Sequence, residues 1–244
     1  MRSRLIIFTL LLLCSSLTQA QKFIAQGKIE YERKVNQHSF LEEGNTWSEM
    51  MLKSTPKFHT AYYDLLFKDN TTLYRAGREP DVRQNKVWGV FECENTVLTH
   101  LDSNTYVAQK DVRNDFFLVA DSVRKIDWKI SNEFRPIAGF NCRKAVGKIM
   151  DSIIVIAFYT DEILPSGGPE SFTGLPGMIL GIAIPRMHAT WYATKLELAE
   201  ISDKELTAPK RGKKNTSAAF GAQVKSTFKD WGEDGKRMIP QVLL

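Results

Sequence analysis

The sequence has few of the residues from which catalytic and metal sites are usually built. Among its 244 residues there are three cysteines and four histidines. No HxH or HExxH spacing occurs, so a local metal centre has no support. The Met50–Met51 pair near His59 is interpreted as ordinary packing rather than as a soft-metal site. No GxSxG, P-loop or dinucleotide pattern is present either. The sequence therefore predicts no catalytic, cofactor-binding or metal-binding residues.

A large excess of one charge is also missing. The chain has 33 basic residues against 28 acidic ones, and the basic residues are spread along it. This balance argues against a nucleic-acid partner. The one dense basic run, "PKRGKK" (Pro209–Lys214), is interpreted as a solvated linker.

Long apolar runs are absent after the first twenty residues. Those residues have a basic start (Arg2 and Arg4), an apolar run over residues 5–13 and a small-residue end before Gln21. This is the pattern of a secretory signal peptide, and the run is shorter than the ~20 apolar residues of a membrane anchor. We expect an exported protein of the periplasm or cell envelope with no membrane span. Removal of the signal lowers the formal charge from +5 to about +3.

The cysteines leave one question open. Cys14 lies in the predicted signal and follows Leu13, where a lipoprotein signal carries a small residue, so no lipid anchor is expected. The two remaining cysteines are Cys93 and Cys142. In an oxidising compartment such a pair favours a disulfide, which would stabilise the fold by about 4 kcal/mol. Two buried free thiols are the alternative.

Alternation of apolar and polar residues is the main structural signal. "KIEYERKV" places Ile29, Tyr31 and Val35 on one face, and "KIDWKI" alternates similarly, whereas "KVWGVFECE" alternates less cleanly. "SIIVIAFYT" is apolar on both faces, as in a covered central strand, and "MILGIAI" and "HATWYATKLEL" follow it. Short turns separate these segments. We expect a mainly β fold with an antiparallel curved sheet, open or half-barrel-like, although a sandwich also fits the pattern.

The C-terminal region has a helical period instead. Thr216 or Ser217 is expected to cap a helix that docks on the sheet. Its apolar residues recur at four, four and three positions: Phe220, Val224, Phe228 and Trp231. The predicted organisation is a signal peptide (1–20), a β-rich domain (21–207), and a basic linker with a helical segment (208–244).

The stretch "SFTGLPGMIL" places glycine and proline directly before an apolar strand. Gly174 or Gly177 is expected to take a positive φ, and Pro176 fixes its own φ and keeps Leu175 extended. We interpret the stretch as a turn that starts a buried strand. A recognition loop is the alternative.

Together, "DWKISNEF", "IAGFNCRKAVG" and "AFYTDEILPSGGPESFTGLPGMILGI" resemble the GLPGLI family of secreted proteins, known mainly from Bacteroidota. Met178 replaces a leucine of the family motif, and Leu164 interrupts its Ile-Pro step. The resemblance implies a structural or recognition role for nine positions: Tyr159, Asp161, Gly168, Pro169, Phe172, Gly174, Leu175, Pro176 and Gly177. The family has no assigned activity. Its members are often encoded beside outer-membrane nutrient transporters, which implies such a transporter as partner.

Two functions are consistent with these features. The favoured one is an exported cell-envelope binding or accessory protein without catalytic activity, whose curved sheet offers an apolar concavity to an apolar ligand or a partner. The alternative is a periplasmic hydrolase with a site assembled from distant residues around Tyr159, Asp161 and Cys142. Asp161 and Glu162 are a poor acid–base pair, because neighbours on a strand point to opposite faces.

Overall fold

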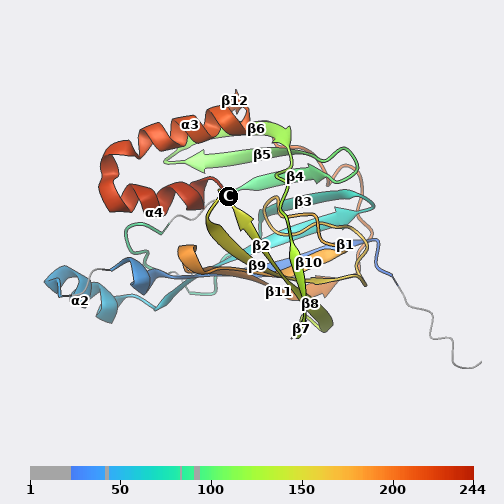
Figure 1. Ribbon diagram of the computed structural model, residues 1–244, viewed down its shortest axis with the longest axis horizontal. Coiled ribbons are helices and arrows are strands. Elements are labelled where there is room, and N and C mark those ends of the chain that lie inside the picture. Colours follow the sequence, from blue (N-terminus) through green and yellow to red (C-terminus); the bar gives the residue numbers. More distant parts are fainter. Residues whose placement is uncertain (1–22, 42–43, 83, 91–93) are drawn as a thin grey trace, which may run out of the picture.

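The computed structural model describes residues 23–41, 44–82, 84–90 and 94–244 and is mainly β (Figure 1). Its strands form one open sheet in the order β12-β6-β5-β4-β3-β2-β1-β11-β10-β9-β8-β7. The expected open, curved sheet is confirmed. Neighbouring strands are antiparallel with one exception, because β12 lies parallel to β6. The predicted signal peptide lies outside the described residues.

The strands follow one another as hairpins over most of the chain. Their bounds are β1 (Gln26–Asn36), β2 (Phe58–Lys68), β3 (Thr71–Ala76), β4 (Thr96–His100), β5 (Thr105–Val112), β6 (Asp115–Ser122), β7 (Lys129–Ile137), β8 (Phe140–Ile149), β9 (Ile153–Thr160), β10 (Met178–Ile184), β11 (Ala189–Glu197) and β12 (Lys213–Asn215). The β1–β2 connection contains η2 (Gln37–Phe40) and α2 (Thr46–Ser54), and η3 (Pro185–Met187) joins β10 to β11.

The period-two pattern correctly predicted the central strands. In β1, Ile29, Tyr31 and Val35 are fully buried and Arg33 on the same face is 4% exposed, while the alternate residues Glu30, Glu32 and Lys34 are half-buried. The doubly apolar β9 lies between β8 and β10, as a covered strand should.

Two expected strands are wrong in part. In "KVWGVFECE", residues 86–90 form no strand, and Gly89 takes a φ of +96° that ordinary strand residues avoid; residues 91–93 of that segment lie outside the described part. In "KIDWKI", the strand begins only at Lys129. Ile126 and Trp128 instead pack across Gly147, where an added Cβ would lie 2.6 Å from the Ile126 side chain.

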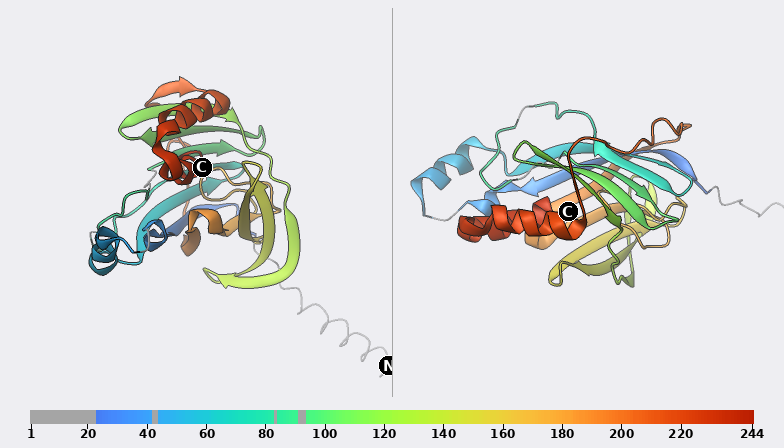
Figure 2. Two further views of the ribbon diagram at one scale, coloured as in Figure 1. Left: turned by 60° about the vertical axis from the view of Figure 1, so that its left-hand side comes forward. Right: turned by 90° about the horizontal axis from the view of Figure 1, so that it is seen from above.

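The concave side of the sheet holds the main core rather than an empty concavity. The sheet curves strongly, and its two ends do not pair with each other (Figure 2). Side chains of β1, β2, β3 and β8–β11 meet there with Phe172 and Leu175 from the loop between β9 and β10. A smaller cluster on the other face joins Leu66, Leu73 and Leu98 to Ile201. Burial of these apolar side chains is the main stabilising contribution.

The C-terminal region packs on β5 and β6, as expected, but as two helices rather than one. Thr216 caps α3 (Ser217–Thr227), its hydroxyl accepting from Ala219 N at 3.2 Å. The turn η4 (Lys229–Trp231) then reverses the chain into α4 (Gly232–Val242). The apolar stripe of α3 contacts Val112, Phe117 and Val119 of the sheet, as the helical spacing predicted.

The basic run before α3 was predicted to be a solvated linker, but part of it packs against the sheet. Lys213–Asn215 forms β12, and the guanidinium of Arg211 lies 3.5 Å from the centre of the Phe116 ring. Across the described residues, no helix is both long and apolar enough to cross a membrane.

Candidate binding cleft

The glycine-proline motif is fixed by close backbone contacts. Gly174 and Gly177 both have positive φ, +90° and +129°. An added Cβ at Gly177 would collide with the carbonyl oxygen of Thr160 and lie 2.8 Å from the Cα of Asp161. Only glycine fits this position, because any side chain would push the loop away from the end of β9.

The loop before β10 is tied into the core on several sides. Phe172 and Leu175 are buried, and Trp128 Nε1 donates to the carbonyl of Thr173 at 2.9 Å. The fully buried Tyr31 hydroxyl donates to the carbonyl of Ile179 at 2.6 Å. These contacts support the interpretation of the motif as a turn that starts a buried strand.

The other motif residues do not form one site with Cys142. Tyr159 and Pro169 are buried, whereas Asp161 is exposed. Gly168 is placed by packing, since an added Cβ there would lie 2.8 Å from the Ile179 side chain. The hydrolase hypothesis therefore gains no convergent set of groups from these residues.

Cys142 is buried and has no disulfide partner among the described residues, and its sulfur lies 3.7 Å from the carbonyl oxygen of Phe140. Burial, with a smaller effect from Glu162, raises the pKa of Cys142 to about 12. At neutral pH the thiol keeps its proton, which is the opposite of what a nucleophilic cysteine needs. Cys93 lies outside the described residues, so the disulfide stays a prediction.

A different place exposes aromatic side chains to solvent. A cleft of ≈ 440 Å³ opens between α2, the 86–90 segment, the tip of the β5–β6 hairpin and the start of α4. In Figure 1, α2 projects from the end of the β1–β2 hairpin beside the α3–α4 pair. Its lining residues include Trp47, Met51, Trp88, Arg113, Trp231 and Met238. We call this feature the tryptophan cleft.

Two stacked indoles form the centre of the tryptophan cleft. The rings of Trp88 and Trp231 are 5.6 Å apart at 17°. Trp231 is held in place, because Phe228 meets it edge-on at 5.0 Å and the Arg113 guanidinium lies 4.9 Å from its centre. Trp88 is 59% exposed and Trp47 on α2 is 46% exposed. The cleft thus presents a prepared aromatic surface to solvent.

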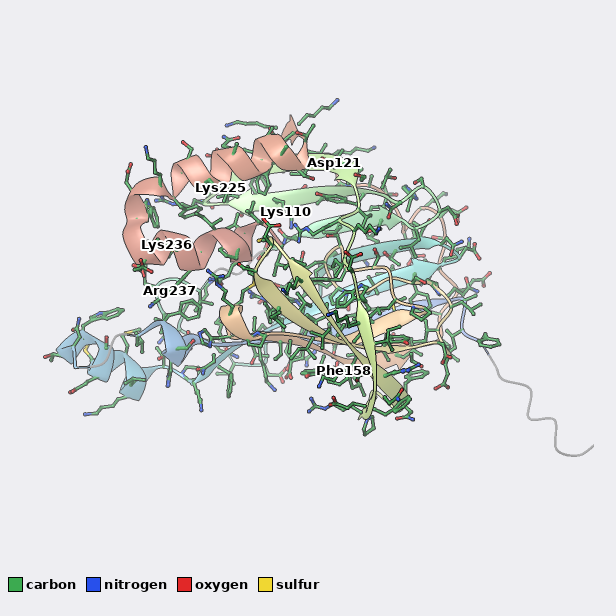
Figure 3. The ribbon with its side chains drawn as sticks, viewed as in Figure 1. Lys110, Asp121, Phe158, Lys225, Lys236 and Arg237 are labelled. Atoms are coloured by element: carbon green, nitrogen blue, oxygen red, sulfur yellow. The ribbon has the colours of Figure 1, made fainter. Side chains whose placement is uncertain are left out.

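The charge of the tryptophan cleft has one sign. Arg113 and Lys86 are its charged residues, and no carboxylate, histidine, cysteine or hydroxyl side chain occurs among the described residues that line it. Beside it, Lys236 and Arg237 of α4 (Figure 3) line a smaller hollow together with Glu233, which forms an ion pair with Lys236. The cleft can stack and attract anions, but it lacks an acid–base pair.

The sequence patterns did not indicate this cleft. Trp88 lay in a segment assigned to a strand, and Trp231 was assigned to the buried stripe of one long helix. Met50, expected to be packed, is 57% exposed on α2. The poor alternation around Trp88, together with Gly89, could have indicated that this segment is not a strand. It could not have shown that four separate segments meet at the cleft.

Comparisons with known proteins show similarity in fold and in one motif region. A family model described as "Protein of unknown function (Porph_ging)" matches residues 147–181, from the end of β8 through the motif into β10. The GLPGLI resemblance stays a prediction from the motif. No curated protein matches the chain.

Solved structures share the fold at low identity. PNGF-II in space group P21 has a TM-score of 0.52 and 15% identity, over 82% of this chain and 33% of that one. In space group C2 it has a TM-score of 0.52 and 16% identity, over 81% and 32%. This chain thus spans about a third of the length of PNGF-II. The comparisons therefore place the chain near a family of unknown function and establish similarity of fold alone.

Proposed function

We propose that this protein is an exported binding or accessory protein of the cell envelope, without catalytic activity, and that the tryptophan cleft holds a segment of a partner protein. The observation that carries the proposal is the exposure of Trp47 and Trp88 beside the anchored Trp231. Large exposed aromatic surfaces are typical of interaction sites, and Trp and Arg dominate the energetic centres of protein interfaces.

A partner protein fits this surface better than an enclosed apolar ligand. Among the described residues, core side chains occupy the concave side of the sheet, where the sequence had predicted an apolar concavity. Outside the cleft, Met50 and Leu52 of α2 and Phe58 at the start of β2 are also exposed apolar side chains. A broad and shallow surface of this kind suits the side chains of a docking protein segment.

The charge around the cleft indicates the chemistry of the partner. Arg113 lies within the cleft and Arg237 lies beside it on α4, whereas the neighbouring Lys236 is paired with Glu233. Positive charge of this kind favours a segment with aromatic or apolar side chains flanked by carboxylates. The resemblance to GLPGLI proteins suggests an outer-membrane transporter as the protein that carries this segment. The predicted signal peptide supports the periplasm or cell envelope as the place of binding.

The hydrolase hypothesis is not favoured by any observation at the residues named for it. Asp161 is exposed while Tyr159 and Cys142 are buried, and the pKa of Cys142 is raised to about 12. The proposed function needs no cofactor, so the test concerns binding alone.

Site-specific photo-crosslinking in the native envelope tests the proposal. A crosslinker replaces Trp47 in otherwise unchanged protein, and a control carries it at Phe134, which is 56% exposed on the far edge strand β7. We expect one protein to be captured from position 47, through an acidic segment, and not from position 134. Adding Trp88→Ala should reduce this capture at least tenfold, as for a central interface residue.

Three outcomes would contradict the proposal. Equal capture from positions 47 and 134 would show non-specific proximity. Undiminished capture in the Trp88→Ala protein would place the contact outside the cleft. Crosslinking to a lipid alone would favour the apolar-ligand alternative over a partner protein.

A further inference from the structure

A buried ion pair joins β5 to the loop before the glycine-proline motif. Lys110 on β5 and Glu170 in the loop before the motif have side chains only 6% and 3% exposed, and Lys110 Nζ lies 3.7 Å from Glu170 Oε2. Figure 3 shows Lys110 on β5 beneath α3. Burying an ammonium and a carboxylate is costly, so such a pair calls for a reason beyond stability.

An asparagine amide meets the same carboxylate oxygen. Asn95 precedes β4 and is 1% exposed, and its Nδ2 donates to Glu170 Oε2 at 2.9 Å. Because Thr96 pairs with Gln109, the antiparallel register places Asn95 opposite Lys110. Directly opposed residues have Cβ atoms about 5 Å apart, within the reach of a lysine side chain. The amine and the amide thus converge on Glu170 from neighbouring strands.

Buried aromatic side chains and the buried guanidinium of Arg33, which lies 5.2 Å from the centre of the Trp191 ring, surround these three residues. The buried Tyr74 stacks on Tyr63 at 5.0 Å, and its hydroxyl accepts from Trp191 Nε1 at 3.2 Å. Burial raises the pKa of Tyr74 well above its usual range, and the nearby carboxylate of Glu170 raises it further. Glu170 is also held at a φ of +54°, a costly conformation for a residue other than glycine. The backbone at Glu170 is therefore strained in the conformation that places this carboxylate.

We propose that Lys110 and Asn95 form an intramolecular isopeptide bond, with Glu170 as the proton carrier. Glu170 takes one proton from the Lys110 ammonium, which leaves a neutral amine beside a carboxylic acid. The amine nitrogen attacks Cγ of Asn95, and the acid donates its proton to the amide as the C–N bond of the amide breaks. The second amine proton passes to Glu170. The products are a Lys110 Nζ–Asn95 Cγ amide and one ammonia molecule, and no oxidant or cofactor is consumed.

The site meets the physical requirements of this reaction. Glu170 Oε2 lies 3.7 Å from Lys110 Nζ and accepts from Asn95 Nδ2, so one carboxylate reaches both reacting groups. The reacting groups are held by the strand register, which supplies the proximity that a spontaneous amide exchange needs. The hollow of ≈ 580 Å³ beside Lys110, also lined by Tyr106 and Ser171, gives ammonia a route to solvent. The product amide also removes the two buried charges of the ion pair.

Peptide mapping of the denatured, reduced, full-length protein tests the bond directly. We expect the tryptic peptide that contains Asn95 to be joined to the peptide that contains Lys110, with a combined mass lower by one ammonia. No cleavage should occur after Lys110. The mapping must be done on peptides, because cyclisation of an N-terminal Gln21 would lower the intact mass by the same amount.

Variants identify the chemistry. Glu170→Gln should give the two separate peptides, Lys110→Arg should do the same, and Asn95→Asp should form the bond with loss of water instead of ammonia. A matched control, Glu205→Gln on the surface, should keep the link. The wild-type peptide map tests the bond even if a core variant fails to fold. Separate peptides with cleavage after Lys110 would overturn the proposal. A link that persists in folded Glu170→Gln protein would also overturn it.

Discussion

The loop around Gly177 and the tryptophan cleft use similar residues in opposite ways. In the loop, Phe172 and Leu175 are buried, and the glycines allow the chain to pass against the end of β9. In the cleft, Gly89 also takes a positive φ, but the neighbouring Trp88 is 59% exposed. The same combination of glycine and apolar side chain therefore fills the core at one place and faces solvent at the other.

The difference separates what is needed for folding from what is available for binding. The loop has the carbonyl of Thr173 paired with Trp128, and the strand that follows has the carbonyl of Ile179 paired with Tyr31, so these groups support the fold. The cleft has its rings aligned by Phe228 and Arg113 yet leaves Trp47 and Trp88 open. A recognisable motif marks the first region, and no motif marks the second.

The largest expected effect is at Gly177. Gly177→Ala should lower the free energy of unfolding by about 4 kcal/mol or more, because backbone strain adds to the collision with Thr160. Gly139→Ala is the matched control, since Gly139 has a φ of +87° with no atom near an added Cβ. It should cost about 1 kcal/mol. Equal losses in chemical denaturation would show that Gly177 is not a packing position.

The next effect is at Leu175, which is 2% exposed. Leu175→Ala should cost about 3 kcal/mol by leaving a cavity in the main core. The exposed neighbour Pro176 is its control, and Pro176→Ala should cost less than about 1 kcal/mol because it acts mainly on the unfolded chain. Thermal melts of the two variants measure the difference. A Leu175→Ala protein that melts like the parent would show that the loop does not contribute to the core.

A smaller effect concerns Cys142 in reduced protein. Its pKa is about 12 in the fold, above that of an exposed thiol, so the unfolded chain loses the thiol proton first as the pH rises. Stability from this group is complete below about pH 8 and falls between there and pH 12. From about pH 9 to pH 10 the parent should lose roughly 1 kcal/mol more than Cys142→Ala.

Identical pH dependence of the two proteins would contradict the burial of this thiol. Alkylation gives an independent check, because native reduced protein should leave Cys142 unmodified at about pH 8, whereas unfolded protein should react fully.

The smallest effect on stability is expected at Trp88. Because the side chain is mostly exposed, Trp88→Ala should change the free energy of unfolding by about 0.5 kcal/mol or less. Its matched comparison is the buried Trp191, where Trp191→Ala should cost about 4 kcal/mol. A large loss at Trp88 would make the cleft part of the core and would remove the basis for the binding proposal.

The sequence predicted the sheet better than it predicted the site. Alternation identified β1 through Ile29, Tyr31 and Val35, because one face of that strand is buried along its length. It failed around Trp128, which packs over Gly147 outside the sheet, since periodicity cannot show which side chain crosses a neighbouring strand. The helix with Phe220 and Val224 was predicted, but the turn at Phe228 was not.

The cleft could not be predicted from the sequence for a related reason. Trp47, Trp88, Arg113 and Trp231 come from four separate segments, and only the packing of α4 beside the 86–90 segment brings them together. The pair Asn95 and Lys110 is similar, because it depends on the register between β4 and β5 and on a carboxylate supplied by Glu170.

The most direct test of the central claim is native mass spectrometry of the protein isolated from its own envelope, comparing the parent with Trp88→Ala and Phe134→Ala. If the tryptophan cleft binds and the loop only supports the fold, the parent and Phe134→Ala should carry one partner protein. Trp88→Ala should be found alone at the same stability. A partner retained by Trp88→Ala, or lost equally from Phe134→Ala, would contradict the assignment of binding to this cleft.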